Sequence, residues 1–598
     1  MRVWLAIFAG VACVAQTPDH TPDHNVALPD YTRAAQVFPR IWAPYVSHQI
    51  PEAKLSNSQT LEVRDGKLPL SVANVVDAVI GNNLTVEAVR YYPEMAQTDL
   101  LRARSGASPR GVDVAVIPSV VFAGAEGGSI LGTAGGSGGG ANNAGGITGS
   151  ASAVNIRPAG VFDPSISVSF SRDHTSSPLN TEVVSGLPSV TTGTSAFSVS
   201  YVQAFPSGTS IAASYSYQRQ LSNQLHLLFD PDFTPGFTMT LSQQLVNGFG
   251  FAVNRALIKV AENEMKIERQ SFRAQTTTVL ASALNAYWDL MAAQEAVRAA
   301  ELELKAALQL VTNNRKEYDV GVMSRLDIAT AESQAASSQR DLVVAQTNEQ
   351  NAELALKTLL TKNLDEPLAS AAIDCTDPFP EPEESPLPSL AEALKVSEEN
   401  RPEIPIAQGN INSEQDAQPF VINALLPTVN AFVLVSNVGL YNVYGTAFSE
   451  AVQFKYPQIA FGLSISFSLH NRQAQADEIR TRLELRQQQD TLVQNKSQIE
   501  VQVESALIAA RQAVEQLKAA REALRLAEVE LDAQQKRLTA GVSTAYNVVL
   551  AQRDVFTARL AEVQARDTYA KARVSLDQAE GTTFEKNHLT IDQALAVR

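Results

Sequence analysis

The sequence predicts an α+β membrane protein, internally duplicated, in which long coiled-coil helical hairpins follow groups of transmembrane β-strands. Three observations predict this class. An apolar seam with helical spacing recurs 220 residues further along the chain, two long stretches contain no proline, and several segments before them alternate polar and apolar residues. A seven-residue period indicates coiled-coil packing, whereas a period of two indicates strands with two different faces.

Residues 1–15 are predicted to be a signal peptide. One Arg is followed by an apolar run that is too short to span a bilayer as a mature helix. The letters "GVAC" ending at Cys13 loosely resemble a lipoprotein cleavage box, but Gly10 stands where a larger aliphatic residue is usual. Lipidation of Cys13 is therefore an alternative to simple cleavage. Residues 16–66 are interpreted as an N-terminal extension.

The composition excludes some functions. Of 598 residues 18% are charged and the net charge is -16, which argues against a nucleic-acid-binding surface. The two His of "HTPDH" (20–24) have the spacing of a metal pair, but Pro22 lies between them and favours a disordered segment. No Ser-His-Asp pattern or nucleophile elbow is found. We predict no metal, no cofactor and no enzymatic activity.

The first repeat is assigned to residues 67–362. It begins with a helix and ends in a long helical hairpin over 255–361. Four alternating segments are strand candidates: 162–172, 195–205, 208–220 and 236–245. By themselves they fit a soluble antiparallel sheet as well as a membrane barrel, and the predicted export and the adjacent long helices favour the barrel.

A glycine-rich insertion covers residues 124–150. From Gly136 the letters "GSGGGA" satisfy a dinucleotide-binding pattern, but no strand, turn and helix surround them. A flexible linker is the favoured interpretation.

The crossover between the repeats is assigned to residues 363–398. Its first part is rich in proline and acidic residues, which predicts a wrap or linker rather than a core. The second repeat, 399–581, contains a helix, strand candidates at 426–441 and 456–470, and a helical hairpin over 472–580. Residues 582–598 are the C-terminal tail.

The apolar seams define the hairpins. The first helices, 255–318 and 472–538, would be about 90 to 100 Å long and need neighbours along their whole length. The two seams correspond at every step, including one polar break: Ala283, Ala286, Leu290, Ala293, Val297, Ala300, Leu304, Ala307, Val311, Asn314, Tyr318, and Val503, Ala506, Ala510, Ala513, Leu517, Ala520, Leu524, Ala527, Leu531, Gln534, Leu538. The frequent Ala predicts closely spaced helices.

Each hairpin turns at a similar sequence, "VGVMSRLD" (320–327) and "AGVSTAYN" (540–547). Gly321 and Gly541 suit the backbone position that ends a helix. Val322 and Val542 are apolar residues at tips that face solvent, and contact with a partner accounts for them better than a plain turn does.

The returning helices have predicted N-terminal caps. Ser324 and Thr544 occupy the cap positions, and Asp327 and Asn547 follow three residues later. These residues are also what a well-formed turn requires without any further function.

The order of six segments carries a resemblance to a known family. They are "LPLSVANVVDAVIGNNLTVEAVR" (68–90), "NRALIKVAENEMKIERQSF" (254–272), "LNAYWDLMAAQEAVRAAELEL" (284–304), "VGVMSRLDIATAESQAASSQRDLVVAQ" (320–346), "NRPEI" (400–404) with "LLPTVNAF" (425–432), and "AGVSTAYNVVLAQRD" (540–554). Each is short and degenerate, but their order and spacing are specific. Over residues 68–123 and 236–581 the chain resembles the TolC-like outer membrane efflux family of trimeric channel-tunnels.

The resemblance implies a homotrimer in which each copy gives four strands to a shared 12-stranded transmembrane β-barrel, continuous with a long periplasmic α-helical barrel. It implies the outer-membrane channel component of a tripartite efflux or secretion system, with outer-membrane lipid, a periplasmic adaptor and an inner-membrane pump as partners. Because the family has two strands where four candidates occur here, one hairpin, 195–220, is extra or extracellular. The competing interpretation is a structural coiled-coil envelope protein or adhesin.

In this family the hairpin tips close the tunnel and dock on the adaptor. The resemblance therefore implies adaptor contact at Gly321, Val322, Ser324, Gly541, Val542 and Thr544. The gate candidates are Arg325, Asp327 and Asn547. The second tip lacks the charged and tyrosyl residues that often close the family's tunnel, so charge-dependent closure is expected from the first hairpin.

Overall fold

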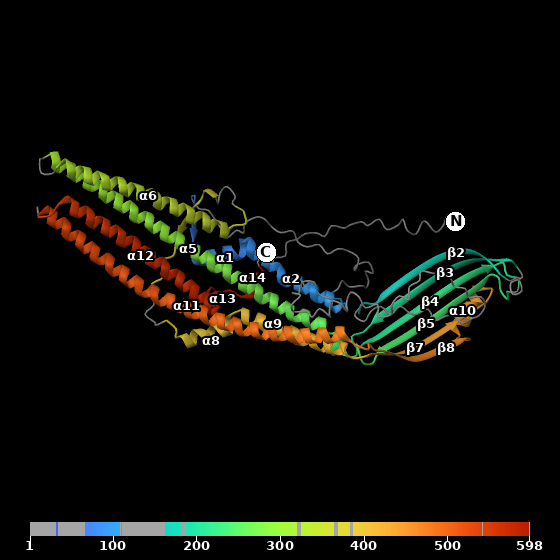
Figure 1. Ribbon diagram of the computed structural model, residues 1–598. Helices are drawn as coiled ribbons and strands as arrows, with labels where there is room; N and C mark the ends of the chain where they lie inside the picture. The colour runs from blue at the N-terminus through green and yellow to red at the C-terminus, as the bar shows by residue number, and fades with distance from the viewer. Residues whose placement is uncertain are drawn as a thin grey trace, which may run out of the picture.

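The computed structural model describes residues 31–33, 66–107, 109, 162–180, 187–225, 227–319, 324–363, 369–382, 387–540 and 542–596. The molecule is elongated, with long helices at one end and a curved sheet at the other (Figure 1). Several predicted features lie outside the described residues, namely the signal peptide with Cys13, the glycine-rich insertion, Gly321, Val322 and Gly541.

Two long helical hairpins form the helical end. The helices are α1 (Val72–Asn82), α2 (Leu84–Arg104), α4 (Phe251–Asn254), α5 (Ala256–Asp319), α6 (Arg325–Leu360), α8 (Leu390–Asn400), α9 (Glu403–Ala424), α10 (Tyr444–Val452), α11 (Arg472–Thr539), α12 (Ala545–Glu580), α13 (Thr583–Lys586) and α14 (Ile591–Ala596). Helix α5 pairs with α6, and α11 pairs with α12. None of the described helices combines the length and the apolarity needed to cross a membrane.

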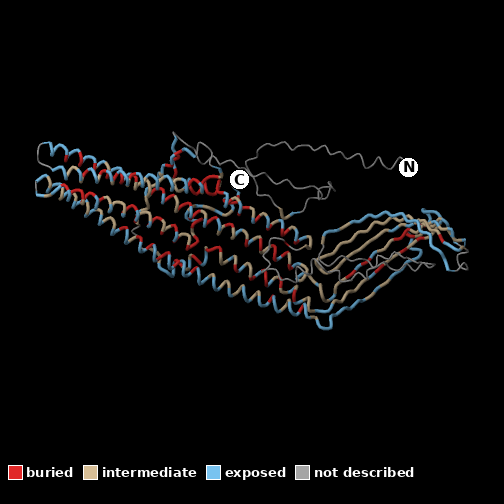
Figure 2. The backbone as a smooth tube through the Cα atoms, turned by 45° about the horizontal axis from the view of Figure 1, so that its top comes forward, coloured by how far each residue is buried: buried red, intermediate tan, exposed pale blue. Residues whose placement is uncertain are grey.

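The seams predicted from the sequence are buried along much of the hairpins, although Tyr318 is exposed and the second seam is only half-buried from Ala520 to Leu538. Helices α5 and α11 contain 64 and 68 residues, which corresponds to about 100 Å each. Leu290 and Ala300 are buried in α5, and Val503 and Ala510 are buried in α11. Figure 2 shows buried residues recurring along the helices, with exposed residues on their outer sides. The long helices thus begin and end within one residue of the predicted positions.

The two hairpins pack against each other as well as internally. Near the tips, Val549 of α12 joins a buried cluster with Ala307 of α5 and Ala331 of α6. Further from the tips, Phe556 of α12 packs against the cluster formed by Val297, Ala300 and Leu342. The four long helices therefore pack together rather than forming two separate rods.

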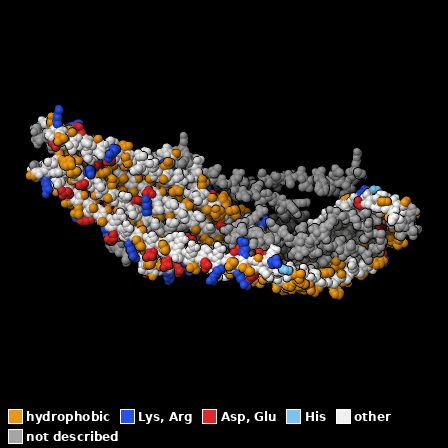
Figure 3. All heavy atoms as spheres, viewed as in Figure 1, with side chains coloured by type: hydrophobic (Ala, Val, Ile, Leu, Met, Phe, Trp, Pro, Cys, Tyr) orange, Lys and Arg blue, Asp and Glu red, His pale blue; other side chains and the backbone are white. Residues whose placement is uncertain are grey.

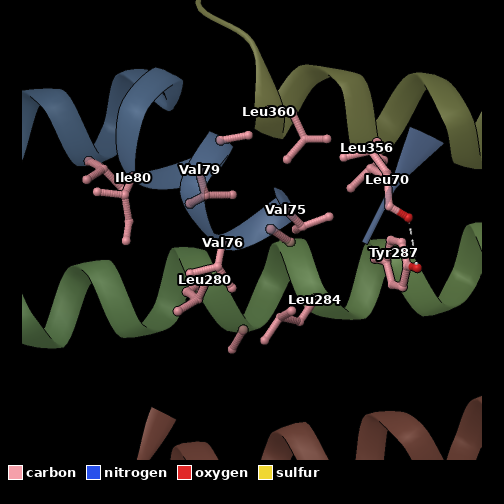
Figure 4. Close-up of a cluster of buried hydrophobic side chains, with 14 of the residues drawn as sticks. Leu70, Val75, Val76, Val79, Ile80, Leu280, Leu284, Tyr287, Leu356 and Leu360 are labelled. Atoms are coloured by element: carbon pink, nitrogen blue, oxygen red, sulfur yellow. Dashed lines mark hydrogen bonds between the residues drawn. The ribbon is translucent and has the colours of Figure 1, made fainter. Parts of the chain in front are cut away.

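The largest hydrophobic core lies about halfway along the helices. Residues of α1, α5 and α6 meet there with the short strand β1 (Lys67–Leu70) (Figure 4). The buried hydroxyl of Tyr287 donates a hydrogen bond of 3.2 Å to the carbonyl of Leu70. Val76 of α1 lies beside Leu280 of α5 in the same view. This core fixes the N-terminal helices against the hairpins.

The crossover contributes to that core, which corrects the prediction of a wrap or linker. Residues Ala372–Cys375 form the strand β6, which pairs in parallel with β1. Ile373 is buried within the main core, and Ala371 beside it is buried too. The four-residue strand is too short to show a period in the sequence, and pairing with a strand about 300 residues away stabilises it.

The C-terminal residues pack onto the same core. Phe584 of α13 and Leu595 of α14 are buried within it. Arg273 of α5 contacts Glu585 at 2.7 Å. The part of the predicted tail that the structure describes is therefore an integral piece of the fold.

A six-stranded antiparallel sheet forms the other end. Its strands are β2 (Ser165–Pro178), β3 (Ser189–Ala204), β4 (Thr209–Ser222), β5 (Asp232–Gln244), β7 (Thr428–Val438) and β8 (Pro457–Ser466), in the spatial order β2-β3-β4-β5-β7-β8. The resemblance implied four strands from each copy, and this number is wrong for the sheet seen here. The hairpin predicted at 195–220 is an extra pair, β3 and β4, and both strands lie within the sheet rather than in an extracellular loop.

The short helix α10 covers the sheet at the end remote from the long helices (Figure 1). Tyr444 packs edge-on against Tyr217 of β4, with ring centroids 5.2 Å apart. The ring centroid of Phe448 lies 5.9 Å from that of Phe237 of β5. Gly439 permits this contact, since a Cβ atom there would collide with the carbonyl oxygen of Ala447.

Candidate functional site

The two hairpin tips lie side by side at the end of the molecule opposite the sheet (Figure 1). At the first tip, Ser324 and Asp327 form a complete capping box. The amide of Asp327 donates to Ser324 Oγ at 3.3 Å, and the Asp327 carboxylate accepts from the Ser324 amide at 3.1 Å. The predicted cap of the first returning helix is confirmed.

The polar break in the first seam supports this turn. Asn314 is buried at the end of α5, and its side-chain amide donates to the carbonyl of Asp327 at 3.3 Å. The next residue, Arg315, contacts Glu332 of α6 at 2.6 Å across the hairpin. A buried amide with a partner is tolerated in an apolar seam, and here it ties the two helices together at the tip.

The second tip is built differently. Thr544 occupies the cap position of α12, but its side chain makes no capping hydrogen bond, so that prediction is wrong. The Asn547 side chain instead donates to Ser543 Oγ at 3.3 Å. Ser543 in turn donates to Gln534, the polar break of the second seam, at 3.0 Å. Both breaks therefore anchor their turns, although through different partners.

Apolar side chains project from both tips. Val542 is 75% exposed, as predicted, and Leu326 on the first returning helix is 74% exposed. Tyr546 on the second returning helix is also exposed. Sequence reasoning missed Leu326 and Tyr546 because each is the second residue of a helix whose apolar seam starts later, and neither belongs to that seam. Together with Val542 they form what we call the tip patch, defined by Leu326, Val542 and Tyr546.

The gate candidates lie in the same region. Arg325 is exposed at the first position of α6, and Asp327 lies two residues further on. The carboxylate of Asp327 also accepts a hydrogen bond of 2.6 Å from the Ser324 hydroxyl, so it is held against the start of the helix. Asn547 is the neutral counterpart at the second tip.

The sheet has one apolar and one polar face. In register across adjacent strands, Val168 lies beside Val199, and Val199 beside Tyr215. The alternate positions carry small polar residues, and Ser169 and Ser198 approach within 2.7 Å through their hydroxyl groups. Hydrophobic side chains gather along the β7 and β8 side of the sheet (Figure 3), where Phe461 is 85% exposed. Such a sheet suits lipid on one side and an aqueous lumen on the other.

A buried carboxyl group was also missed. Glu414 of α9 has no exposed surface, and neither of its carboxyl oxygens has a hydrogen-bond partner among the described residues. Burial, with a smaller contribution from the negative charge of Glu484 on α11, raises the pKa of Glu414 to about 8. Glu484 is itself paired with Arg480 at 2.6 Å. Within the described part of the chain, no group of three His, Cys, Asp or Glu residues could hold a metal ion.

The two-faced sheet and the long hairpins agree with a comparison against known families. The family model described as outer membrane efflux protein matches residues 205–362 and 394–582, more than half of the chain. The chain belongs to the outer membrane efflux protein family. The resemblance inferred from the six sequence segments is confirmed.

Individual members of this family are distant relatives. The outer membrane efflux protein BepC of Brucella suis biovar 1 (strain 1330) is 25% identical over 348 residues, which cover 57% of this chain and 71% of BepC. The CmeC outer membrane channel of Campylobacter jejuni matches with a TM-score of 0.56 at 15% identity, covering 98% of this chain and 99% of CmeC. The open state of the MtrE outer membrane channel of Neisseria gonorrhoeae matches with a TM-score of 0.53 at 16% identity, covering 89% and 93% of the two chains.

Membership of the outer membrane efflux protein family decides the location and the general role. The protein is the outer-membrane channel component of an efflux system, and it extends from the outer membrane into the periplasm. The sheet is the membrane part, with its apolar face toward lipid, and the hairpin tips are the periplasmic end.

Proposed function

We propose that the protein is the passive exit duct of a tripartite export system. Three copies share one barrel and one helical tunnel, and substrate passes through them from an inner-membrane pump and a periplasmic adaptor to the exterior. The observation that carries this proposal is the two-faced sheet, which continues directly into helices of about 100 Å. Six strands are fewer than the roughly eight that the smallest filled barrels use, so several copies must share one barrel.

Conduction is tested in planar bilayers. The purified protein should be a trimer and should give discrete, long-lived conductance steps without nucleotide or a proton gradient, because the duct itself uses no energy. Trimeric protein that inserts but never conducts would contradict the proposal.

The periplasmic tips are proposed to bind the adaptor. The proposed contact residues are Gly321, Val322, Ser324, Gly541, Val542 and Thr544, together with the tip patch. The support is the exposure of large apolar side chains at a position that would otherwise meet water.

Val542→Asp should abolish this contact, because a charge in the apolar patch would have to be desolvated on binding. We expect at least a tenfold loss of efflux in cells, with the trimer intact. Val501→Asp is the matched control, since Val501 is exposed like Val542 but lies on α11, far from the tip. Wild-type efflux in the Val542→Asp strain would refute the adaptor assignment.

Closure of the tunnel is proposed to depend on Arg325 and Asp327 of the first tip, with Asn547 as the uncharged counterpart on the second. In a ring of three copies, charged side chains at a narrow mouth control ion passage. Arg325→Gln should raise the fraction of time that channels spend open in bilayers, whereas Asn547→Ala should leave it unchanged. An effect of similar size from both substitutions would contradict the unequal roles.

A further inference from the structure

The number of strands in the sheet exceeds what the duplication of the chain accounts for. The second repeat supplies two strands, β7 and β8, between α9 and α11. The first repeat supplies four strands between α2 and α5. Because β2 follows α2 and β5 precedes α5, these two correspond to β7 and β8, and β3 with β4 is the added hairpin.

The added hairpin is part of the sheet over its whole length. Every residue of β4 from Thr209 to Gln220 pairs with β5, and all 14 residues of β2 pair with β3. An extracellular excursion would lose this pairing beyond the membrane-spanning part. The strands β3 and β4 also reach the end of the sheet that is nearest the helices, where the other strands begin or end.

The turn between β3 and β4 is hydrogen-bonded to neighbouring residues at that end of the sheet. Gln244 at the end of β5 donates its amide to the carbonyl of Gly208 at 3.0 Å. Gly250 donates to Ser207 at 3.2 Å. Gly208 has φ near +85°, and a Cβ atom there would collide with the carbonyl oxygen of Gly248. The turn is therefore held at the periplasmic rim, next to the start of the long helices.

The face pattern of the sheet is continuous across the added hairpin. Phe197 of β3 lies between Phe170 of β2 and Tyr217 of β4 on the apolar face. On the polar face, Ser198 lies between Ser169 and Ser216. A hairpin that lay outside the barrel would not need one lipid face and one aqueous face in register with its neighbours.

The two edges of the sheet require partners in the membrane. Strands β2 and β8 have no strand neighbour on their outer sides within the described residues. The stretches nearest the helices, Ser165–Ser171 of β2 and Gln458–Ser466 of β8, contain neither charged residues nor proline, the usual protection of free edges. The charged residues and Pro178 of β2, and Pro457 of β8, lie at the end of the sheet remote from the helices. Unpaired backbone groups are not tolerated in hydrocarbon. Because β2 runs away from the helices and β8 runs back toward them, β8 of one copy can pair antiparallel with β2 of the next.

The geometry points to a shared barrel that contains all six strands of each copy, closed by β8 of one copy against β2 of its neighbour. With the three copies of the proposed function, on which this inference rests, the barrel has 18 strands instead of the 12 that the resemblance implied. Barrel diameter grows roughly in proportion to strand number, so the membrane pore is about 1.5 times as wide. The alternative is a narrower barrel in which β4 forms the edge and β2 with β3 lies outside it.

Cross-linking between copies distinguishes the two arrangements. In the full-length chain with Cys375→Ser, Val168→Cys on β2 is combined in turn with Phe461→Cys, Leu463→Cys and Ile465→Cys on β8, and intact cells are treated with a short bis-maleimide. Scanning three positions allows for the unknown register. We expect at least one pair to give covalent dimers and trimers on denaturing gels.

The control pair and the competing pair complete the design. Ala213→Cys with Met239→Cys joins directly opposed positions of β4 and β5, so it should react within one chain and leave the mass of a monomer. Ala213→Cys on β4, on the same face of the sheet and away from α10, is combined with the same three β8 positions and should give no product between chains. Products from β4, or no product from β2 while the control pair reacts, would overturn the 18-stranded barrel.

The mass of the untreated protein in detergent separates this inference from the proposed function. A trimer that cross-links through β4 refutes only the strand number. A protein that is not trimeric refutes the proposed function, and with it the number 18.

Discussion

At the scale of single residues, Glu414 is a carboxyl group held away from water. It lies between α9 and α11 with no exposed surface, and the negative charge of Glu484 is nearby. Taking an ionised carboxylate out of water is costly, so the neutral acid is the form that this site accepts. With a pKa near 8, Glu414 carries its proton at neutral pH.

Replacing Glu414 with Gln should remove a dependence of stability on pH. The pKa is raised in the folded state, so the stabilising effect of protonation is complete below pH of about 4.5 and is lost as the pH rises through about 8. Relative to the wild type, Glu414→Gln should gain stability by about 1.4 kcal/mol per pH unit across part of this window.

Thermal melts at pH 5, 7 and 9 measure this effect. Glu504→Gln is the control, because Glu504 is an exposed carboxylate on α11 and should change little. If the melting temperatures of the wild type and Glu414→Gln changed with pH in the same way, Glu414 would be solvated in the assembled protein and the prediction would be wrong.

At the scale of elements, the two returning helices begin with similar sequences but unequal caps. Ser324 and Asp327 satisfy each other's backbone amides at the start of α6. The Thr544 side chain satisfies no backbone amide at the start of α12. The first tip is therefore stabilised within its own turn, whereas the second relies on Ser543 and Gln534.

This difference predicts unequal responses to alanine. Ser324→Ala removes a capping acceptor and should destabilise the first turn of α6 by about 1 kcal/mol. Thr544→Ala is the matched control and should have almost no effect on α12. Hydrogen–deuterium exchange over the first turn of each helix measures the change, and equal acceleration at both tips would contradict the observed caps.

The long helices and the existence of all six strands of the large sheet could be predicted, while some strand ends and the strand in the crossover could not. A seam sustained over ten steps, with no proline, predicts a helix from local information alone. Strand β3 begins at Ser189, whereas the predicted strand began at 195. The prediction missed the first residues because they are mostly Thr and Ser and show no apolar alternation. Pairing with the polar end of β2 holds them in the sheet. The strand β6 likewise depends on β1, which no local pattern reveals.

At the scale of the whole molecule, the duplication could be predicted. The difference in strand number between the two repeats could be predicted only in part. The sequence showed four strand candidates before the first hairpin, and their positions alone left open whether one pair was extracellular. The position of this pair within the sheet depends on the hydrogen bond between Gly208 in the turn and Gln244 at the end of β5. Candidate tip residues could be predicted from repetition, whereas Glu414 could not, since its burial requires α11, which is distant in the sequence, to pack over α9.

The placement of α14 beside α2 has a consequence for the order in which the protein folds. The buried guanidinium of Arg90 donates a hydrogen bond of 3.2 Å to the carbonyl of Ala594, 504 residues later in the chain. Contacts of such sequence separation form late, because the intervening chain must first be made and brought back. The mid-length core thus stays incomplete until residue 594 has been synthesised and exported. Until then the growing chain lacks a finished core, which delays rigid assembly until the chain has reached the periplasm.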